Sequence, residues 1–173
     1  MSNSEIIIRN LNVLDNVAYL DFAFNIINEN IYSISSRSEF DYSPEEEKEW
    51  IERMLLNKHN ICIVALYENR IIANLNIIQN NFRKMSHVAE LIINIDKEFR
   101  GQGLGGKILS LALKSAHKDP CIKIITLEVI ETNRRAINLY KKFGFVVDGI
   151  HKDFIRQNDE YVNLLSMSLN LED

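Results

Sequence analysis

HVAELIINIDKEFRGQGLGGKI, residues 87–108, is the stretch of sequence that decides the fold. Residues 87–95 are mostly apolar and β-branched and predict a strand. Four of the chain's six glycines crowd into residues 101–106, and residues 103–117 then show the apolar spacing of a helix. Glycines let the backbone approach an anion, and free N–H groups at a helix start point toward it. The stretch therefore predicts a phosphate-binding loop.

Two common phosphate-binding patterns fit this loop incompletely. Gly101, Gly103 and Gly106 satisfy the dinucleotide pattern G-x-G-x-x-G, but that motif normally opens a doubly wound sheet. Here a hairpin and two helices come first. Gly101, Gly106 and Lys107 match the front of a Walker A loop, yet Ile108 lacks the hydroxyl that would bind Mg²⁺. A nucleotide triphosphatase is therefore disfavoured.

A third pattern, R-x-x-G-x-G, is formed by Arg100, Gly103 and Gly105. Residues 131–145 later read ETNRRAINLYKKFGF: an Asn, a helix that contains Ala, and a Tyr before a Gly-Phe turn. In this order and spacing, the two motifs resemble those of the GNAT superfamily of N-acyltransferases. The resemblance runs from the first strand to the closing hairpin. It implies a GNAT-like acyl-CoA N-acyltransferase fold, with acetyl-CoA as co-substrate.

The rest of the chain predicts the other elements of an α/β (α+β) fold. Besides 87–95, strands are expected at residues 5–9, 60–67, 71–79, 122–130, 145–150 and 160–169. Helices are expected at 14–27, from a capping box at Ser43 onward, at 103–117 and at 133–143, with a loop or irregular helix at 31–42. Residues 87–130 must form a parallel crossover. We expect a mixed, mostly antiparallel sheet of about six to seven strands flanked by about four helices.

Composition narrows the class of protein. The length of 173 residues suits one domain, residues 1–173, and the net charge of −4 gives no sign of nucleic acid or an anionic membrane as a partner. Neither a signal peptide nor an apolar stretch of about 20 residues is visible, so we expect a cytoplasmic protein. Cys62 and Cys121 lie in apolar runs and are expected to be buried free thiols, and no Cys/His spacing suggests a metal.

The resemblance also implies which residues bind acetyl-CoA. The backbone of residues 93–95 would pair with the pantetheine arm, in a slot between the strands at 87–95 and 122–130. N–H groups of the glycine loop would hold the pyrophosphate, Asn133 would bond pantetheine or a nearby loop, and Lys142 or Arg135 would approach the adenosine phosphate. The predicted cofactor-binding residues are Ile93, Asn94, Ile95, Arg100, Gly101, Gln102, Gly103, Leu104, Gly105, Gly106, Asn133 and Lys142.

Two residues are candidates for the chemistry. Glu90 sits in an otherwise apolar strand, where a partly desolvated carboxylate could take a proton from the amine through water. A glutamate paired to an arginine, or one that points to solvent, is the alternative. Tyr140, by its place in the second motif, would donate a proton to the departing sulfur, although its helical spacing also suits a core tyrosine. Direct transfer is preferred over a cysteine relay.

The acceptor is expected to be a primary amine of a small molecule, such as an amino acid or a polyamine. The first two helices, the loop at 31–42 and the closing hairpin would select it, with Phe40 and Tyr42 among the candidates. The run Glu45–Glu47 is interpreted as a solvated helix start. Alternatives are a protein N-terminus or lysine as acceptor, and a non-catalytic acyl-CoA-binding module. The family's strand ends can pair between subunits, which leaves a homodimer open.

Overall fold

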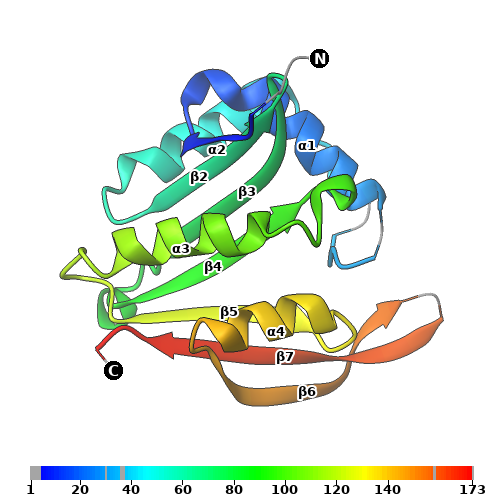
Figure 1. Cartoon of the computed structure of the whole chain (residues 1–173), viewed down its shortest axis with the longest axis vertical. Coiled ribbons are helices and arrows are strands. Elements are labelled where there is room, and N and C mark those ends of the chain that lie inside the picture. The colour runs from blue at the N-terminus through cyan, green and yellow to red at the C-terminus, as the bar shows by residue number, and fades with distance from the viewer. Residues whose placement is uncertain (1–4, 30, 36–37, 158, 173) are drawn as a thin grey trace.

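The computed structural model describes residues 5–29, 31–35, 38–157 and 159–172, which form one seven-stranded mixed sheet (Figure 1). Its strands are β1 (Ile7–Asn10), β2 (Ile61–Tyr67), β3 (Arg70–Gln79), β4 (Val88–Ile95), β5 (Ile124–Ile130), β6 (Val146–Gln157) and β7 (Glu160–Asn170), in the order β1-β2-β3-β4-β5-β7-β6. The helices are α1 (Asn16–Asn28), α2 (Pro44–Leu56), α3 (Leu104–Ala116) and α4 (Arg134–Lys142). Within these residues only β4 and β5 pair in parallel, so the predicted fold class is confirmed.

Local sequence signals explain where the helices begin and end. The Ser43 hydroxyl accepts a hydrogen bond from the Glu46 N–H at 3.2 Å, and the Glu46 carboxylate accepts one from the Ser43 N–H at 2.8 Å. This is the predicted capping box of α2, with Pro44 in the first turn. Gly144 follows α4 with φ of +92°, the left-handed conformation that ends helices.

The helices cover the two faces of the sheet separately. Side chains alternate along β2: Ile63 and Ala65 belong to the core under α3 and α4, whereas Cys62 and Val64 belong to the core under α1 and α2. Figure 1 shows α1 and α2 beside β2 and β3, and α4 over β5 and β7. The sheet therefore separates two sets of side chains, which matters for the site described below.

The last hairpin is longer than the sequence predicted. The strand expected to end at residue 150 continues as β6 to Gln157, because an irregular stretch between His151 and Ile155 absorbs extra residues, with Asp153 at φ of +52°. The Gln157 amide donates to the Ile31 carbonyl oxygen, so the hairpin contacts the segment after α1. Residues 31–35 and 38–42 form turns, bends and coil, and residues 36–37 of the predicted loop lie outside the described residues. No helix in the described part of the chain is long and apolar enough to cross a membrane.

Candidate active site

β4 and β5 separate halfway along their length. They pair at Val88–Ile124, Ala89–Ile125 and Glu90–Thr126, and no further pair joins them in the described structure. On its other side, β4 stays paired with β3 as far as Ile95. The half of β4 after Glu90 thus has an open edge, in the region where the resemblance implied a pantetheine slot.

Backbone hydrogen bonds show which residues of β4 face that edge. The Val88 carbonyl accepts from the Asn80 N–H at 2.9 Å, and the Asp96 N–H donates to the Ile72 carbonyl at 2.9 Å. Even-numbered residues therefore direct their backbone groups toward β3. Because the direction alternates along a strand, the N–H and C=O of Ile93 face the open edge.

Asn94 departs from the prediction for the same reason. Its backbone is directed toward β3, not toward the open edge, and its side-chain amide donates to Asn74 Oδ1 at 3.1 Å. Ile95 faces the edge, but its carbonyl accepts from the Arg100 Nε at 2.7 Å. Of the predicted residues 93–95, Ile93 is thus the one with both backbone groups available.

The glycine loop presents a row of free N–H groups. Gly101 and Gly103 adopt φ of +78° and +85°, and Gly103 caps α3 without a side chain. The first N–H that bonds within α3 is that of Lys107, which donates to the Gly103 carbonyl at 3.1 Å. The N–H groups of residues 101–106 donate to no other described residue. At the positive end of a helix dipole, they fit an anion such as a pyrophosphate.

Arg100 corrects the prediction at the start of the loop. Its N–H donates to the Lys97 carbonyl at 3.3 Å, and its Nη2 lies 2.6 Å from Glu29 Oε2. Its Nε also donates to the Ile95 carbonyl oxygen, so each of these contacts is with another residue of the chain. Arg100 therefore ties the loop to β4 and to the end of α1, and its N–H is not free to bind phosphate.

The helix of the second motif, α4, packs directly against the glycine loop at residues 101–106. A Cβ at Gly105 would lie 3.1 Å from Ile95 Cδ1 and 3.2 Å from Leu139 Cδ2, so a larger residue would have to displace these two side chains by a few tenths of an ångström. A Cβ at Gly101 would lie 3.7 Å from the Arg135 guanidinium carbon. Arg135, Leu139 and Lys142 share one face of α4, since they are spaced by four and three residues. Through Arg135, this face brings positive charge to the loop.

Asn133 caps α4, a role that the motif did not specify. Its Oδ1 accepts from the Ala136 N–H at 3.2 Å. Its amide NH₂ group donates to no residue that the structure describes. The predicted bond from Asn133 to pantetheine stays a prediction, with that NH₂ as the available donor.

Tyr140 lies in the core on the α3 and α4 face. Its side chain is only 6% exposed, its ring centroid is 5.8 Å from that of Phe145, and it shares the cluster with Leu91 and Ile93 of β4. Its hydroxyl makes no hydrogen bond with any described residue. Burial raises the pKa of Tyr140, so the hydroxyl keeps its proton at neutral pH.

Glu90 occupies a different environment from the one expected. Its side chain is exposed, so the expected partial desolvation is wrong: even-numbered residues of β4 point away from the main core. Glu90 pairs with Thr126 of β5, in the last pair before β4 and β5 separate. Its side chain lies on the same face of the sheet as those of Ile92 and Asn94. Its role as a base stays a prediction.

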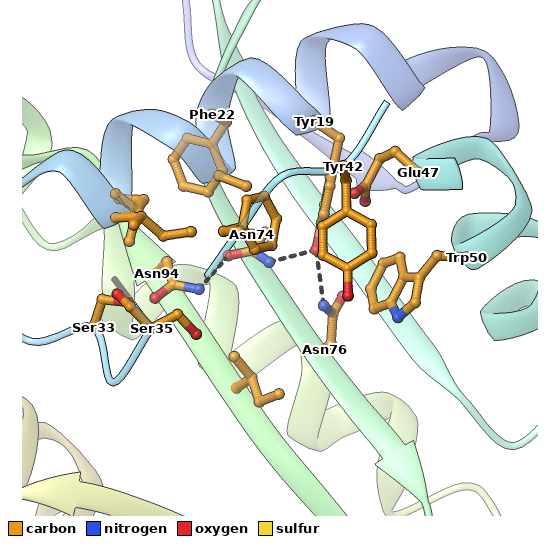
Figure 2. Close-up of a pocket in the computed structure, with 15 residues that line it drawn as sticks. Tyr19, Phe22, Ser33, Ser35, Tyr42, Glu47, Trp50, Asn74, Asn76 and Asn94 are labelled. Carbon is orange, nitrogen blue, oxygen red and sulfur yellow. Dashed lines mark hydrogen bonds between the residues drawn. The ribbon is translucent and has the colours of Figure 1, made fainter. Parts of the chain in front are cut away.

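A pocket of about 330 Å³ lies on that face, between the sheet and the first two helices (Figure 2). Its lining combines aromatic rings, apolar side chains and a few polar groups: Tyr19, Phe22, Ala23, Ile26, Ile27, Ser33, Ser35, Phe40, Tyr42, Glu47, Trp50, Asn74, Asn76, Ile92 and Asn94. Phe40 and Tyr42 were expected to select the acceptor, and both line it. Because Ile92 and Asn94 lie on β4 beyond Glu90, the pocket adjoins the open edge.

Glu47 is the residue that the sequence interpretation missed. It is 5% exposed and lines the pocket, and burial raises the pKa of its carboxyl group. The interpretation of Glu45–Glu47 as a solvated run is therefore wrong at this position. The available signal was spacing, since Glu47 precedes Trp50 and Ile51 by three and four residues and must share their apolar face.

Tyr19 joins two asparagines at the floor of the pocket. Its hydroxyl oxygen accepts from Asn74 Nδ2 at 2.6 Å and from Asn76 Nδ2 at 2.9 Å, as Figure 2 shows. Burial raises the pKa of Tyr19 to about 12. Asn76 is 2% exposed, and its Oδ1 has no hydrogen-bond partner in the described structure. Among the described residues, none satisfies this buried acceptor beneath the pocket.

Neither cysteine lines the pocket or belongs to the glycine loop, although Cys62 packs in the same core as Tyr19 and Trp50. Cys62 is buried as expected, and burial raises its pKa to about 11. Cys121 is exposed, so its expected burial is wrong; it follows α3, at the opposite end of that helix from the glycine loop. With His59 and Asp119 it offers potential metal-ligand atoms within 4.8 Å of one another. Asp119 already accepts from Cys121 N–H and contacts His59 at 2.8 Å, which accounts for the cluster as a link between loops.

Comparison with known proteins gives one consistent result. Residues 28–145 match the model of the Acetyltransferase (GNAT) family. The L-amino acid N-acetyltransferase AaaT of Escherichia coli is 27% identical over 119 residues, which are 69% of this chain and 74% of that protein.

Two solved structures share the fold. An acetyltransferase of the GNAT family from Streptococcus pneumoniae superposes with a TM-score of 0.90 at 22% identity, covering 96% of this chain and 99% of that one. The yncA protein from Salmonella typhimurium, solved with its cofactor acetyl-CoA, superposes with a TM-score of 0.85 at 19% identity, covering 98% of this chain and 96% of that one.

Proposed function

The chain belongs to the GNAT acetyltransferase family, and we propose that it transfers the acetyl group of acetyl-CoA to a primary amine of a small molecule by direct attack in a ternary complex. One observation carries this proposal: the open edge of β4 lies between the free N–H groups of residues 101–106 and the pocket over Ile92 and Asn94. An anion site and an enclosed acceptor pocket thus meet at one strand edge.

The cofactor fits the donors that the chain leaves free. Acetyl-CoA supplies the acetyl thioester when it is bound. The N–H groups of residues 101–106 hold its pyrophosphate, and the backbone of Ile93 pairs with the pantetheine arm as an added strand would. Arg135 and Lys142 supply positive charge for the adenosine phosphate, and the Asn133 amide supplies a further donor.

Two side chains move protons in this proposal. The amine arrives mostly charged at neutral pH, since alkyl amines have a pKa of about 10. Exposed Glu90, beside the point where the strands separate, takes its proton through water. Tyr140, on the opposite face, donates its retained proton to the sulfur, and a β4 backbone N–H that faces the open edge stabilises the oxyanion.

The cysteines support direct transfer. Burial raises the pKa of Cys62 to about 11, so the thiolate needed for a covalent relay is scarce at neutral pH. Cys121 lies beyond the far end of α3, a helix of 13 residues and thus about 20 Å long.

The pocket favours a small molecule over a protein acceptor. Its polar floor is buried between α1, α2 and the sheet, and its volume of about 330 Å³ suits a small molecule. The test is a thermal-shift comparison of acetyl-CoA, ATP and NAD, followed by release of free CoA thiol across polyamines, amino acids, aminoglycosides and peptides. Stabilisation by acetyl-CoA alone and turnover with a small amine are expected. Stabilisation without turnover of any amine would indicate a non-catalytic acyl-CoA-binding module instead.

A further inference from the structure

The charge lining the pocket is one-sided. Among its described lining residues, Glu47 is the one charged side chain, and no lysine or arginine accompanies it. It is 5% exposed and forms no ion pair with a described residue. A buried carboxylate without a cation is costly, and it is stabilised when a ligand brings the positive charge.

The surroundings of Glu47 also suit a cation. Asn76 Oδ1, fully buried without a hydrogen-bond partner among the described residues, adds an uncompensated negative partial charge beneath the pocket. The rings of Tyr19 and Trp50, with centroids 5.8 Å apart, and that of Tyr42 border the same space, as Figure 2 shows. Aromatic faces attract an ammonium group, most strongly where water is excluded.

This cation site lies away from the edge where acetyl transfer would occur. α2, which carries Glu47, packs through Ile51 on β2 and β3, and Asn76 lies on β3 itself. The open edge belongs to the far side of β4, more than one strand spacing, about 4.8 Å, beyond β3. One nitrogen cannot occupy both positions.

Apolar side chains connect the two ends. Phe22 and Ile26 of α1 and Ile92 of β4 line the pocket along with the polar floor. Such walls suit methylene groups. They offer no positive charge to pair with the carboxylate of an amino-acid acceptor.

We propose that Glu47, together with the rings of Tyr19 and Trp50, binds a second ammonium group of the acceptor, so that the preferred acceptor is an aliphatic diamine. The inference rests on the proposed acetyl transfer. One amine reacts at the open edge of β4, and the other stays charged at Glu47.

A matched pair of amines tests this preference. We expect kcat/KM for 1,5-diaminopentane to exceed that for pentylamine at least tenfold, because the two differ only in the distal ammonium group. Glu47→Gln keeps the shape of the side chain and removes its charge, so most of the preference is lost. Glu45→Gln removes an exposed charge from the same turn and leaves the preference intact. Equal kcat/KM for the two amines in the unsubstituted enzyme would overturn the inference but not the proposed function.

Binding can be followed without turnover. Trp50 is the single tryptophan of the chain and lines the pocket, so its fluorescence reports occupancy directly. A saturable fluorescence change with 1,5-diaminopentane supports the cation site even if acetylation fails, provided that Glu47→Gln binds the diamine at least tenfold more weakly. The melting temperature of Glu47→Gln should be no lower than that of the unsubstituted protein, because the substitution removes an unpaired buried charge. No saturable change, or the same affinity in Glu47→Gln, contradicts the cation site. The proposed function fails separately, if acetyl-CoA gives neither a thermal shift nor turnover.

Discussion

Replacing Tyr140 by Phe separates a catalytic from a structural role. The substitution removes one oxygen atom and leaves the ring, and thus its packing against Phe145, in place. A hydroxyl that serves only the core would change stability alone. A hydroxyl that protonates the sulfur would change turnover.

The expected effect on turnover follows from general acid catalysis. Burial raises the pKa of Tyr140, so its proton is present throughout the neutral range and is held more tightly than on an exposed tyrosine. Loss of a positioned proton donor lowers kcat by a factor of about 10² to 10⁴. Acetyl-CoA binding is expected to be unchanged, because the loop and the β4 backbone supply the binding groups.

The expected effect on stability is small. The Tyr140 side chain is 6% exposed, and its hydroxyl has no hydrogen-bond partner among the described residues. Its oxygen still reaches solvent, because Asn76 Oδ1 is the one fully buried, unpartnered side-chain oxygen or nitrogen among the described residues. Removal of the hydroxyl is therefore expected to change the free energy of unfolding by less than about 1 kcal/mol, and the melting temperature by less than about 4 °C.

Thiol release gives kcat, and calorimetry gives the melting temperature of the same samples. Tyr161→Phe removes the same atom from an exposed side chain and is expected to change neither quantity. Unchanged kcat in Tyr140→Phe would remove the residue from the mechanism. A melting temperature lower by more than about 4 °C would show that the hydroxyl has a stabilising partner, which the geometry argues against.

Three further predictions concern the glycine loop and two buried titratable groups, the Cys62 thiol and the Tyr19 hydroxyl. Gly103→Ala, at φ of +85° with open space around its Cβ position, is expected to cost about 1–2 kcal/mol of unfolding free energy and to weaken acetyl-CoA binding in a thermal-shift titration. Arg100→Ala and Glu29→Ala are expected to weaken that binding to a similar extent, with less than additive effects in the double variant because both break one 2.6 Å ion pair. Burial raises the pKa of Cys62 to about 11 and of Tyr19 to about 12, so the unfolded chain releases these protons at lower pH than the folded protein does. The free energy of unfolding is thus retained below about pH 9. Between pH 9 and 12 it falls by up to about 1.4 kcal/mol per pH unit for each group. In urea titrations across this range, Cys62→Ala should show a smaller decline than the unsubstituted protein.

The sequence predicts the loop and most elements because these depend on local chemistry. Glycines at 101 and 103 supply the positive φ that the turn needs, and Ser43 with Glu46 encodes a capping box that forms as expected. Such signals act over a few residues. They therefore do not depend on how distant parts of the chain pack.

The features that local signals do not predict depend on contacts between distant segments. The separation of β4 from β5 after Glu90 and Thr126 leaves no mark in the alternation of either strand, and a slot between them was expected from the family resemblance alone. Glu90 reads as buried because its neighbours are apolar, yet β4 faces one core with its odd residues and the pocket with its even ones. The end of β6 was misplaced because the bulge around Asp153 interrupts the strand pattern without ending the strand.

The two halves of the site are independent because side chains alternate along β4. Ile93 faces the core that contains Tyr140, whereas Ile92 and Asn94 face the pocket that contains Glu47. A group at the open edge is therefore reached from both faces of the sheet at once. A change at Glu47 should alter the choice of amine and leave acetyl-CoA binding intact, and a change in the glycine loop should do the reverse. If either substitution changed both affinities alike, the amine and the cofactor would share one set of residues, and the separation by the sheet would not describe how this enzyme selects its acceptor.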